Sequence, residues 1–255
     1  MNTGNVSVEK SGPVAVVRLD KPPVNAIDLE LLADAEAALT AVEADPDIRA
    51  VVVTGTGQSF CGGLNLKKVP FYHADQQRRM VEDLNRIITR LYGFPRPLIT
   101  AMNGHAIAGG LILALVGDYR IGPVGPYLFG FTEVRAGIPF PYCTLELLKA
   151  ELPQGTARRL MLVGRNLDSE EALTGGVLDE LQPAGQVLAR ALELARDLAG
   201  LPAEAYGRIK RQAKGEALAR MEEAVRTNSD PLLQCWLTGE SRTSAPELLL
   251  QARRG

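Results

Sequence analysis

The chain has few of the residues that build metal sites and disulfide frameworks. It contains 2 histidines and 3 cysteines in 255 residues, and Cys61, Cys143 and Cys235 lie far apart. An odd number of widely spaced cysteines fits free thiols in a reducing compartment better than a disulfide framework. Two histidines without a cluster of carboxylates beside them give no metal site. We therefore expect a cytoplasmic protein that binds no metal.

Long apolar runs and an excess of charge of one sign are also absent. No apolar run approaches the ~18 residues of a membrane span, and residues 1–13 lack the apolar core of a signal peptide. The net charge is −2 and no basic run is interleaved with aromatic residues, so nothing supports a nucleic-acid surface. What is present, 46% hydrophobic and 23% charged residues, is the composition of a globular protein with a sizeable core.

The first half of the chain alternates predicted strands and helices. Apolar patterning predicts a hairpin over residues 6–19, and Asp28 is a good N-cap for a helix that ends before Asp45. The uniformly apolar residues 50–54 predict a strand buried on both faces. An apolar stripe predicts a helix over residues 75–91.

The second half is predicted to be mostly helical, after short extended segments over residues 119–121, 127–129 and 132–134. We expect helices over residues 144–151, 154–163, 169–174, 185–198, 203–219, 221–237 and 245–252. There is no internal repeat long enough for a solenoid.

Two glycine-bearing loops are the most informative features. Residues 55–68, GTGQSFCGGLNLKK, have neither the GxGxxG spacing nor the Lys-Ser/Thr of a nucleotide-binding loop. Residues 99–121 predict a strand, an Asn-Gly turn and an apolar helix that opens with Gly109 and Gly110. The first N–H groups of a helix have no internal partner, and glycine lets a ligand approach them. This loop therefore favours an oxygen that bears or develops negative charge, or else its glycines only let a buried helix pack tightly.

Taken in order, the motifs resemble the crotonase, or enoyl-CoA hydratase/isomerase, superfamily. Residues 60–66, FCGGLNL, match the family pattern Phe-(Ser/Cys/Ala)-(Ala/Gly)-Gly-x-(Asp/Asn)-Leu. Residues 103–110, NGHAIAGG, with Asp118 following, match its second pattern. Residues 130–139 carry the Gly-x-x-Glu-Val and Gly-x-Pro elements of its third. The match runs from about residue 14 to residue 177, with looser helical agreement beyond.

The resemblance implies an α/β fold, a crotonase-like spiral of ββα units with a helical C-terminal region. On this basis we expect a core with the CoA-binding and catalytic pocket over residues 1–195. Residues 196–255 would form a helical trimerisation region, in a homotrimer or a hexamer made as a dimer of trimers. The implied ligand is an acyl-CoA thioester, in which coenzyme A is part of the substrate, with no separate cofactor and no nucleic-acid or membrane partner.

The resemblance also assigns roles to residues of both loops. The backbone N–H groups of Leu64 and Gly109 would hold the thioester carbonyl, in agreement with the interpretation of the loops from the residues alone. The carbonyl groups of Gly62 and Leu64 would hold the adenine. Lys21 or Lys67 would meet the CoA phosphates, or would otherwise be solvated surface charges.

The carboxylates decide which reaction follows. Hydratases of this family generally use two glutamates, and here the first position is Ile112, which cannot exchange a proton, while the second is Glu133. One glutamate with an oxyanion hole suffices to move a proton between C2 and C4 of a 3-enoyl-CoA, whereas hydration usually needs a second group. The pattern is therefore most similar to the monofunctional Δ3,Δ2-enoyl-CoA isomerases of fatty acid metabolism, with a pocket-facing Glu133 of raised pKa.

Several alternatives remain open at this point. The protein could be an enoyl-CoA hydratase, another crotonase-type lyase or thioester hydrolase, or a non-catalytic acyl-CoA-binding protein. Glu133 could be an exposed carboxylate paired with Arg135, and Cys61 could act as a nucleophile beside the first donor. His73 and His105 are better explained by helix-start and packing roles. Residues 142–144 are candidates for shaping the far end of the pocket.

Overall fold

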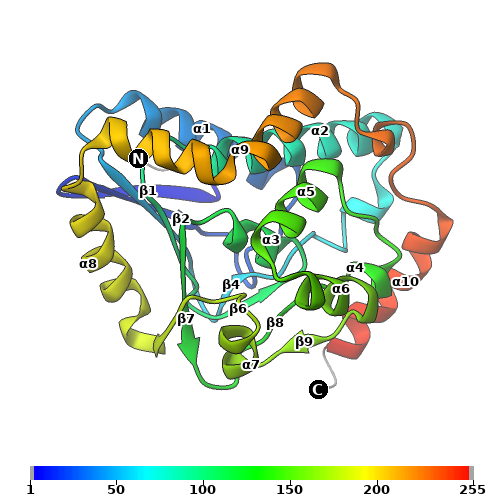
Figure 1. The fold of residues 1–255 in the computed structure, drawn as a ribbon. Coiled ribbons are helices and arrows are strands. Elements are labelled where there is room, and N and C mark those ends of the chain that lie inside the picture. The colour runs from blue at the N-terminus through cyan, green and yellow to red at the C-terminus, as the bar shows by residue number, and fades with distance from the viewer. Residues whose placement is uncertain (1–2, 253–255) are drawn as a thin grey trace.

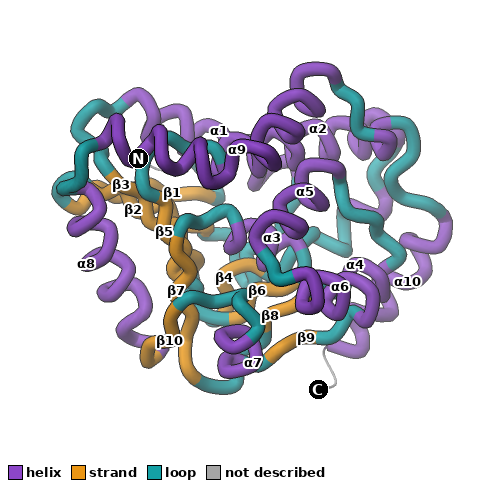
Figure 2. The backbone as a smooth tube through the Cα atoms, viewed as in Figure 1, coloured by secondary structure: helices purple, strands orange, loops and turns teal. Residues whose placement is uncertain are grey.

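The computed structural model describes residues 3–252, which form two β-sheets covered by helices (Figures 1 and 2). The larger sheet has the strand order β1-β2-β3-β5-β7-β10 and the smaller one β4-β6-β8-β9. The strands are β1 (Val6–Ser11), β2 (Val14–Leu19), β3 (Ala50–Gly55), β4 (Ser59–Cys61), β5 (Leu98–Ala101), β6 (His105–Ile107), β7 (Tyr119–Val124), β8 (Phe129–Gly130), β9 (Asn166–Leu167) and β10 (Glu180–Pro183).

The α-helices lie between and around these strands. They are α1 (Leu29–Ala44), α2 (Ala74–Tyr92), α3 (Gly109–Leu115), α4 (Glu133–Ala136), α5 (Tyr142–Glu151), α6 (Gln154–Val163), α7 (Ser169–Thr174), α8 (Val187–Ala199), α9 (Ala203–Thr227) and α10 (Gly239–Ala252). Three short 3-10 helices, η1 (Val69–Phe71), η2 (Ala184–Gln186) and η3 (Pro231–Leu233), complete the described elements.

Successive strands alternate between the two sheets. β3, β5 and β7 join the larger sheet, and β4, β6 and β8, each next in sequence, join the smaller one. A helix follows each pair, since α2 comes after β4, α3 after β6 and α4 after β8. This repeated unit is the ββα spiral that the family resemblance implied, and the helical C-terminal region follows it.

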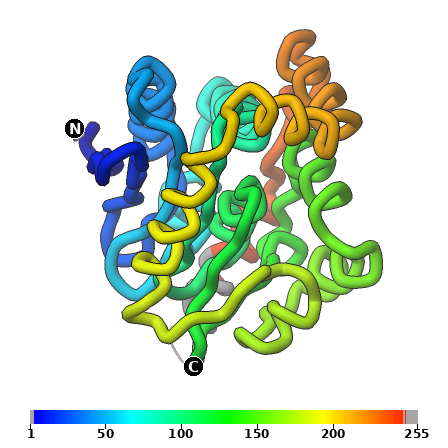
Figure 3. The backbone as a smooth tube through the Cα atoms, turned by 60° about the vertical axis from the view of Figure 1, so that its left-hand side comes forward, coloured from blue at the N-terminus to red at the C-terminus, as the bar shows by residue number. Residues whose placement is uncertain are grey.

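Helices cover both faces of the larger sheet, as a largely parallel sheet requires. α8 crosses one face, as the view of Figure 3 shows, and packs its alanines against small and β-branched side chains of the central strands. α1 and α2 lie on the opposite side with the main hydrophobic core. Every residue of β3 is buried, which confirms the prediction of a strand buried on both faces.

The beginning and end of α1 agree with the sequence prediction. The Asp28 carboxylate accepts a hydrogen bond from the backbone N–H of Leu31 at 3.1 Å, so Asp28 is the N-cap. The helix ends at Ala44, immediately before Asp45 and Pro46. The predicted last helix, residues 245–252, lies within α10.

The prediction of an extended segment over residues 132–134 was wrong. Glu133 is the first residue of α4, a single turn that Gly137 closes with φ at 64°. A helix of four residues is too short to display an apolar period, so its pattern could not be distinguished from that of a strand. The strands β6, β9 and β10, of two to four residues, were missed for the same reason.

The two helices predicted over residues 203–219 and 221–237 were also wrong. The chain forms one helix, α9, which ends at Asn228 in the left-handed conformation, with φ at 48°. Asp230 then accepts a hydrogen bond from the N–H of Leu232 and starts the short turn η3. The Asn-Ser-Asp-Pro sequence of residues 228–231 stops the helix because Pro231 cannot donate to the ladder. Trp236 therefore lies in a non-helical segment.

The chain contains no helix, within residues 3–252, that is both long and apolar enough to cross a membrane. The division into a core up to residue 195 and a trimerisation region beyond it stays a prediction.

Candidate active site

The two glycine loops are packed directly against each other. Gly63 has a φ of 82°, and a Cβ atom built on it would lie 2.7 Å from the Cβ of Ala108 and 3.2 Å from the backbone nitrogen of Gly109. Only a residue without a side chain fits this contact. The first loop thus reaches the N-terminus of α3, although more than forty residues separate the two in sequence.

The backbone N–H of Leu64 is left without a partner by the way its loop pairs with Ile27. The N–H of Ile27 donates to the Gly63 carbonyl at 2.7 Å, and the Ile27 carbonyl accepts from Asn65 at 2.7 Å. These two bonds engage the residues on either side of Leu64, whose own N–H donates to no atom of residues 3–252. It is available to a ligand.

Gly109 supplies a second available donor beside the first. It is the first residue of α3, so its N–H has no partner within the helix, and it donates to no other atom of the described chain. A Cβ atom built on Gly109 would lie 3.9 Å from the Leu64 nitrogen. The preceding residue, Ala108, has a φ of 53°, a strained value for alanine of the kind often found at functional sites.

The neighbouring glycine, Gly110, serves packing instead. A Cβ atom on it would lie 2.0 Å from the carbonyl oxygen of Cys61, so α3 could not approach β4 with any larger residue. The packing interpretation is therefore confirmed for Gly110, and the binding of an anionic oxygen at Gly109 stays a prediction. Gly109 leaves a donor open and Gly110 lets the helix pack.

Glu133 is buried and lacks an ionic partner. Its side chain is part of a residue only 7% exposed, and its Oε2 atom is buried without a hydrogen bond. Burial raises the pKa of Glu133 to about 8, although the backbone N–H groups of Glu133 and Thr132 oppose the shift. Arg135 does not pair with it, since its guanidinium donates to the carbonyls of Gly164 and Val163. The alternative of an exposed, salt-bridged Glu133 was wrong.

Glu133 lies between two small cavities of about 30 Å³ each. One contains the two donor residues Leu64 and Gly109 and is otherwise almost wholly apolar. Its lining is Ile27, Leu64, Leu84, Ile88, Gly109, Ile112, Leu113, Glu133, Ile138, Pro139, Phe140, Pro141, Thr144 and Trp236. The other cavity shares Leu64 and Glu133 and extends to Gly62. One carboxylate and two residues with unpartnered N–H groups thus line the same largely apolar cavity.

The groups predicted to hold CoA differ in whether they already have hydrogen-bond or ion-pair partners within the chain. The carbonyl oxygens of Gly62 and Leu64 accept no hydrogen bond within residues 3–252. The ammonium group of Lys21 is bound to Asp28 and, at 3.2 Å, to Glu30. Lys67 is exposed and its ammonium group forms no ion pair with the described residues. A phosphate would have to displace two carboxylates from Lys21 and none from Lys67.

The remaining candidates have structural roles. The Cys61 thiol donates to the Asn25 carbonyl at 3.1 Å, and burial raises its pKa to about 12, so it is not a nucleophile at neutral pH. His73 caps α2, and Nδ1 of His105 accepts from the N–H of Leu128. Of residues 142–144, only Thr144 lines the cavity. Trp236 was not identified from the sequence as a residue of the cavity, because a helix was predicted over residues 221–237.

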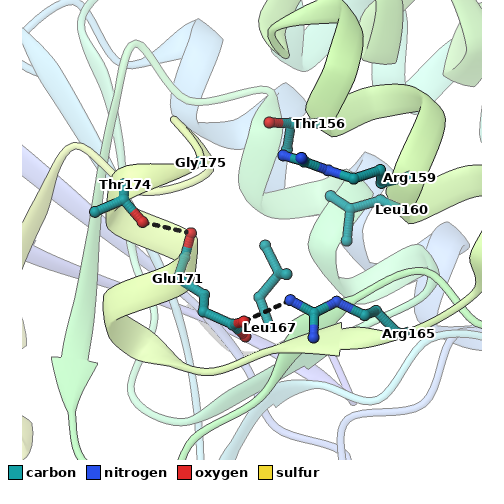
Figure 4. A pocket seen from close by; sticks show the side chains of 8 residues that line it. All are labelled: Thr156, Arg159, Leu160, Arg165, Leu167, Glu171, Thr174 and Gly175. Carbon is teal, nitrogen blue, oxygen red and sulfur yellow. Dashed lines mark hydrogen bonds and ion pairs between the residues drawn. The ribbon is translucent and has the colours of Figure 1, made fainter.

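A larger polar pocket, of about 250 Å³, lies between α6, β9 and α7 (Figure 4). Figure 4 shows the guanidinium group of Arg165 paired with Glu171, at 2.5 Å, and the hydroxyl of Thr174 directed toward the Glu171 backbone. Its lining includes none of the predicted catalytic residues. Size alone therefore does not identify the reactive site.

Comparisons with known proteins identify similar chains and similar structures. The model of the enoyl-CoA hydratase/isomerase family matches residues 9–243. A putative enoyl-CoA hydratase of Thermus thermophilus is 36% identical over 198 residues, which cover 76% of this chain and 77% of the relative. The mitochondrial enoyl-CoA delta isomerase 1 of Mus musculus is 32% identical, with 86% and 78% covered. The crystal structure of human mitochondrial delta3-delta2-enoyl-CoA isomerase superposes with a TM-score of 0.88 at 26% identity, covering 98% of each chain.

Proposed function

The chain belongs to the enoyl-CoA hydratase/isomerase family, and we propose that it moves the double bond of a 3-enoyl-CoA thioester to the 2-trans position. The observation that carries the proposal is the single carboxylate of the apolar cavity. Glu133 is the one acidic residue in the lining, and Ile112 occupies the same wall without a proton to exchange.

The proposed reaction is a proton shuttle with no net change of atoms. The Glu133 carboxylate takes a proton from C2, and the electron pair of the broken C–H bond delocalises into the thioester as a dienolate. The N–H groups of Leu64 and Gly109 stabilise the negative charge on the thioester oxygen. Glu133 then returns the proton to C4, the thioester carbonyl re-forms, and the double bond now lies between C2 and C3.

The surroundings of Glu133 suit a residue that accepts and returns one proton. A general base works best when its pKa lies near the operating pH, and the pKa of Glu133 is about 8. Because Oε2 has no partner, no hydrogen bond has to break before it accepts a proton. The apolar walls also keep water away from the dienolate.

Hydration of a 2-enoyl-CoA is the second candidate, because the relative from Thermus thermophilus is named a putative hydratase. Addition of water needs a group that orients or deprotonates the water, besides the acid that protonates C2. Apart from Glu133 and the indole N–H of Trp236, Thr144 supplies the remaining polar side chain of the cavity. A hydroxyl is a weak base, so this lining favours isomerisation.

The test compares wild type, Glu133→Gln and Ile112→Glu on 2-enoyl-CoA and 3-enoyl-CoA. We expect wild type to isomerise well above any hydration, and Glu133→Gln to lose ~10²-fold or more in isomerase turnover. Ile112→Glu adds a second carboxylate and should raise hydration at some cost in stability, because it buries a charge.

Two outcomes would contradict the proposal. Efficient hydration of 2-enoyl-CoA by wild type would identify a hydratase. Undiminished isomerisation by Glu133→Gln would show that Glu133 is not the base. Binding of CoA is the control, since Glu133→Gln leaves the predicted adenine contacts of Gly62 and Leu64 intact and should keep wild-type affinity.

We also propose that the protein assembles as a trimer or a dimer of trimers. Val134, Leu162 and Val163 are 51%, 69% and 55% exposed, and Val134 is packed beside Gly164, the residue after Val163. Exposed apolar side chains gathered in this way favour contact with another protein surface. Light scattering in solution measures the assembly directly.

A further inference from the structure

We infer that the side chain of Trp236 forms an end wall of the acyl pocket and restricts the protein to short-chain acyl-CoA thioesters. The inference rests on the proposed function in one respect only, that the cavity beside Glu133 receives an acyl chain. The family relationship does not specify chain length, so the limit has to come from the side chains of this chain.

The available space is small and Trp236 bounds it. The cavity that contains Glu133 and both donors measures about 30 Å³, which is room for roughly two water-sized groups. Trp236 lines this cavity and is 1% exposed, so its indole ring is buried against the other walls. Each carbon that a longer acyl chain adds therefore has to displace more of the surrounding walls.

Two hydrogen bonds hold this wall in place. The indole N–H of Trp236 donates to the Pro139 carbonyl at 2.9 Å, in the segment that follows α4. The N–H of the next residue, Leu237, donates to Oε1 of Gln77 on α2 at 3.1 Å. The segment of Trp236 and Leu237 thus joins α2 to the segment after α4, and moving it breaks a buried and a part-buried hydrogen bond.

The ring is also flanked by stiff neighbours. Pro139 and Pro141, which line the cavity with Phe140, have fixed φ angles. After Trp236 the chain continues into α10, where the Ser241 hydroxyl donates to the Gly137 carbonyl at 2.6 Å. The C-terminal segment of this chain therefore closes its own pocket by several independent contacts.

A second route for a longer chain would pass Leu113. This side chain lines both the catalytic cavity and a separate apolar cavity of about 40 Å³ between α1, α2 and the larger sheet. Leu113 is held by packing alone, whereas Trp236 is held by packing and hydrogen bonds. The variants Trp236→Ala and Leu113→Ala therefore open different ends of the pocket and can be told apart.

Binding of saturated acyl-CoA thioesters tests the wall without requiring any reaction. Trp236 is the single tryptophan of the chain, so the intrinsic tryptophan fluorescence reports on this wall alone. For wild type we expect butyryl-CoA and hexanoyl-CoA to shift that fluorescence and to bind at least about tenfold more tightly than dodecanoyl-CoA. Calorimetry gives the affinities of the variants that lack tryptophan.

Trp236→Ala should bind dodecanoyl-CoA at least about tenfold more tightly than wild type while binding butyryl-CoA within a few-fold of it. Trp236→Phe, which keeps an aromatic ring, is the matched control and should retain most of the wild-type preference. Unfolding temperatures and circular dichroism confirm that each variant folds, and if Trp236→Ala does not, Trp236→Leu replaces it.

The inference is overturned if wild type binds dodecanoyl-CoA as tightly as hexanoyl-CoA. It is also overturned if Leu113→Ala admits the long chain and Trp236→Ala does not. Turnover of 3-hexenoyl-CoA and 3-dodecenoyl-CoA is measured in parallel. A shifted binding profile without isomerisation by any variant would reject the proposed function and leave the wall established.

Discussion

Two carboxylates of this protein, one buried and one half-buried, lie in opposite surroundings. Glu133 lies in the apolar cavity with Oε2 unpartnered, and its pKa is raised to about 8. Asp118 lies where α9 docks beside β7, and there the chain surrounds the carboxylate with donors. The same chemical group is thus left without a partner in one region and forms stabilising bonds in the other.

The surroundings of Asp118 are fully polar. Its Oδ2 accepts from the N–H of Leu98 at 2.9 Å, from the hydroxyl of Tyr206 at 3.0 Å and from the ammonium group of Lys210 at 2.8 Å. Its Oδ1 accepts from Lys214 at 2.9 Å. Burial alone would raise the pKa of Asp118, but the two ammonium groups outweigh it and hold the pKa below its usual value.

The comparison separates buried polar groups by whether the chain satisfies them. A satisfied group stabilises the fold, and its loss leaves partners buried without a bond. An unsatisfied group costs stability and is available to a ligand. By this criterion Glu133 and the N–H groups of Leu64 and Gly109 are unsatisfied groups, whereas Asp118 is a satisfied one.

Removing the satisfied carboxylate should have the largest effect on stability. Asp118→Asn leaves two buried ammonium groups without their counter-ion, and we expect it to lower the free energy of unfolding by about 3–5 kcal/mol. Urea unfolding measures this loss. Turnover per folded molecule should stay near wild type, because Asp118 does not line the catalytic cavity.

The matched control for Asp118→Asn lies on α9, the helix that supplies both lysines of Asp118. Glu204 pairs with Arg208 at 2.7 Å, with both side chains more than three-quarters exposed. Glu204→Gln should change the unfolding free energy by less than about 1 kcal/mol. Equal effects of the two substitutions would show that burial and pairing do not distinguish these carboxylates.

Removing an unsatisfied donor should change catalysis and leave stability nearly untouched. Gly109→Pro deletes the N–H at the first position of α3, a position where proline fits a helix. We expect turnover to fall by about 10²–10³-fold, equivalent to about 3 kcal/mol of barrier. Steady-state kinetics on 3-enoyl-CoA, with a check that the oligomer is folded, measures the loss.

Gly109→Ala separates the donor from the side chain. It keeps the N–H and adds a Cβ atom 3.0 Å from Cδ1 of Ile27, the flexible end of that side chain. We expect it to retain most of the activity that Gly109→Pro loses. Wild-type turnover in a folded Gly109→Pro protein would reject the oxyanion hole.

Removing the unsatisfied carboxylate should stabilise the protein while it inactivates it. The folded-state pKa of Glu133 is about 8, above the ordinary 4.5, so the folded state holds its proton over that range and the unfolded state does not. Stability therefore falls as the pH rises from about 4.5 to about 8. Glu133→Gln removes this loss, and we expect a gain of roughly 1–3 kcal/mol at pH 8.

The same titration sets the pH dependence of the reaction. Isomerisation needs the ionised carboxylate, so kcat/KM of wild type should rise with pH and level off above about pH 8. Thermal unfolding at pH 5 and pH 8 provides the contrast, since the gain from Glu133→Gln should shrink at pH 5. An equal gain at both values, or a flat kinetic profile, would contradict a buried base.

The sequence predicted several single elements because they depend on short-range signals, whereas the ββα spiral was implied by the family resemblance. The N-cap at Asp28, the uniformly apolar β3 and the glycines of both loops are local features with a direct structural meaning. The family resemblance then placed Leu64, Gly109 and Glu133 in one pocket. Their catalytic roles stay predictions that the variants above test.

The far wall of the pocket could not be predicted in this way. Trp236 reaches the cavity only because α9 ends at Asn228 and the chain turns back across α2, and the apolar spacing of residues 221–237 indicated a continuous helix instead. Nor could the sequence tell that Lys21 is bound by Asp28 and Glu30, since that depends on the path of the loop between β2 and α1. Long-range packing decides both.

The smallest effect concerns the two lysines, to which the same criterion applies. Lys21 is satisfied by two carboxylates, and Lys67 is exposed without an ion pair among the described residues. We expect Lys67→Ala to weaken CoA binding by a few-fold, equivalent to about 0.5–1 kcal/mol, and the difference to shrink as salt is raised. Lys21→Ala should instead lower stability, because it removes the closer of the two lysines paired with the buried Asp28 and leaves, among the described residues, only Lys68, at 3.6 Å. It should leave CoA affinity within about twofold. Titration calorimetry with CoA at low and high salt measures both variants.

If Lys21→Ala weakened binding more than Lys67→Ala, ion pairing within the chain would not predict which lysines bind the phosphates. If calorimetry detected no binding of CoA at millimolar concentration, the proposal of an acyl-CoA ligand would be rejected.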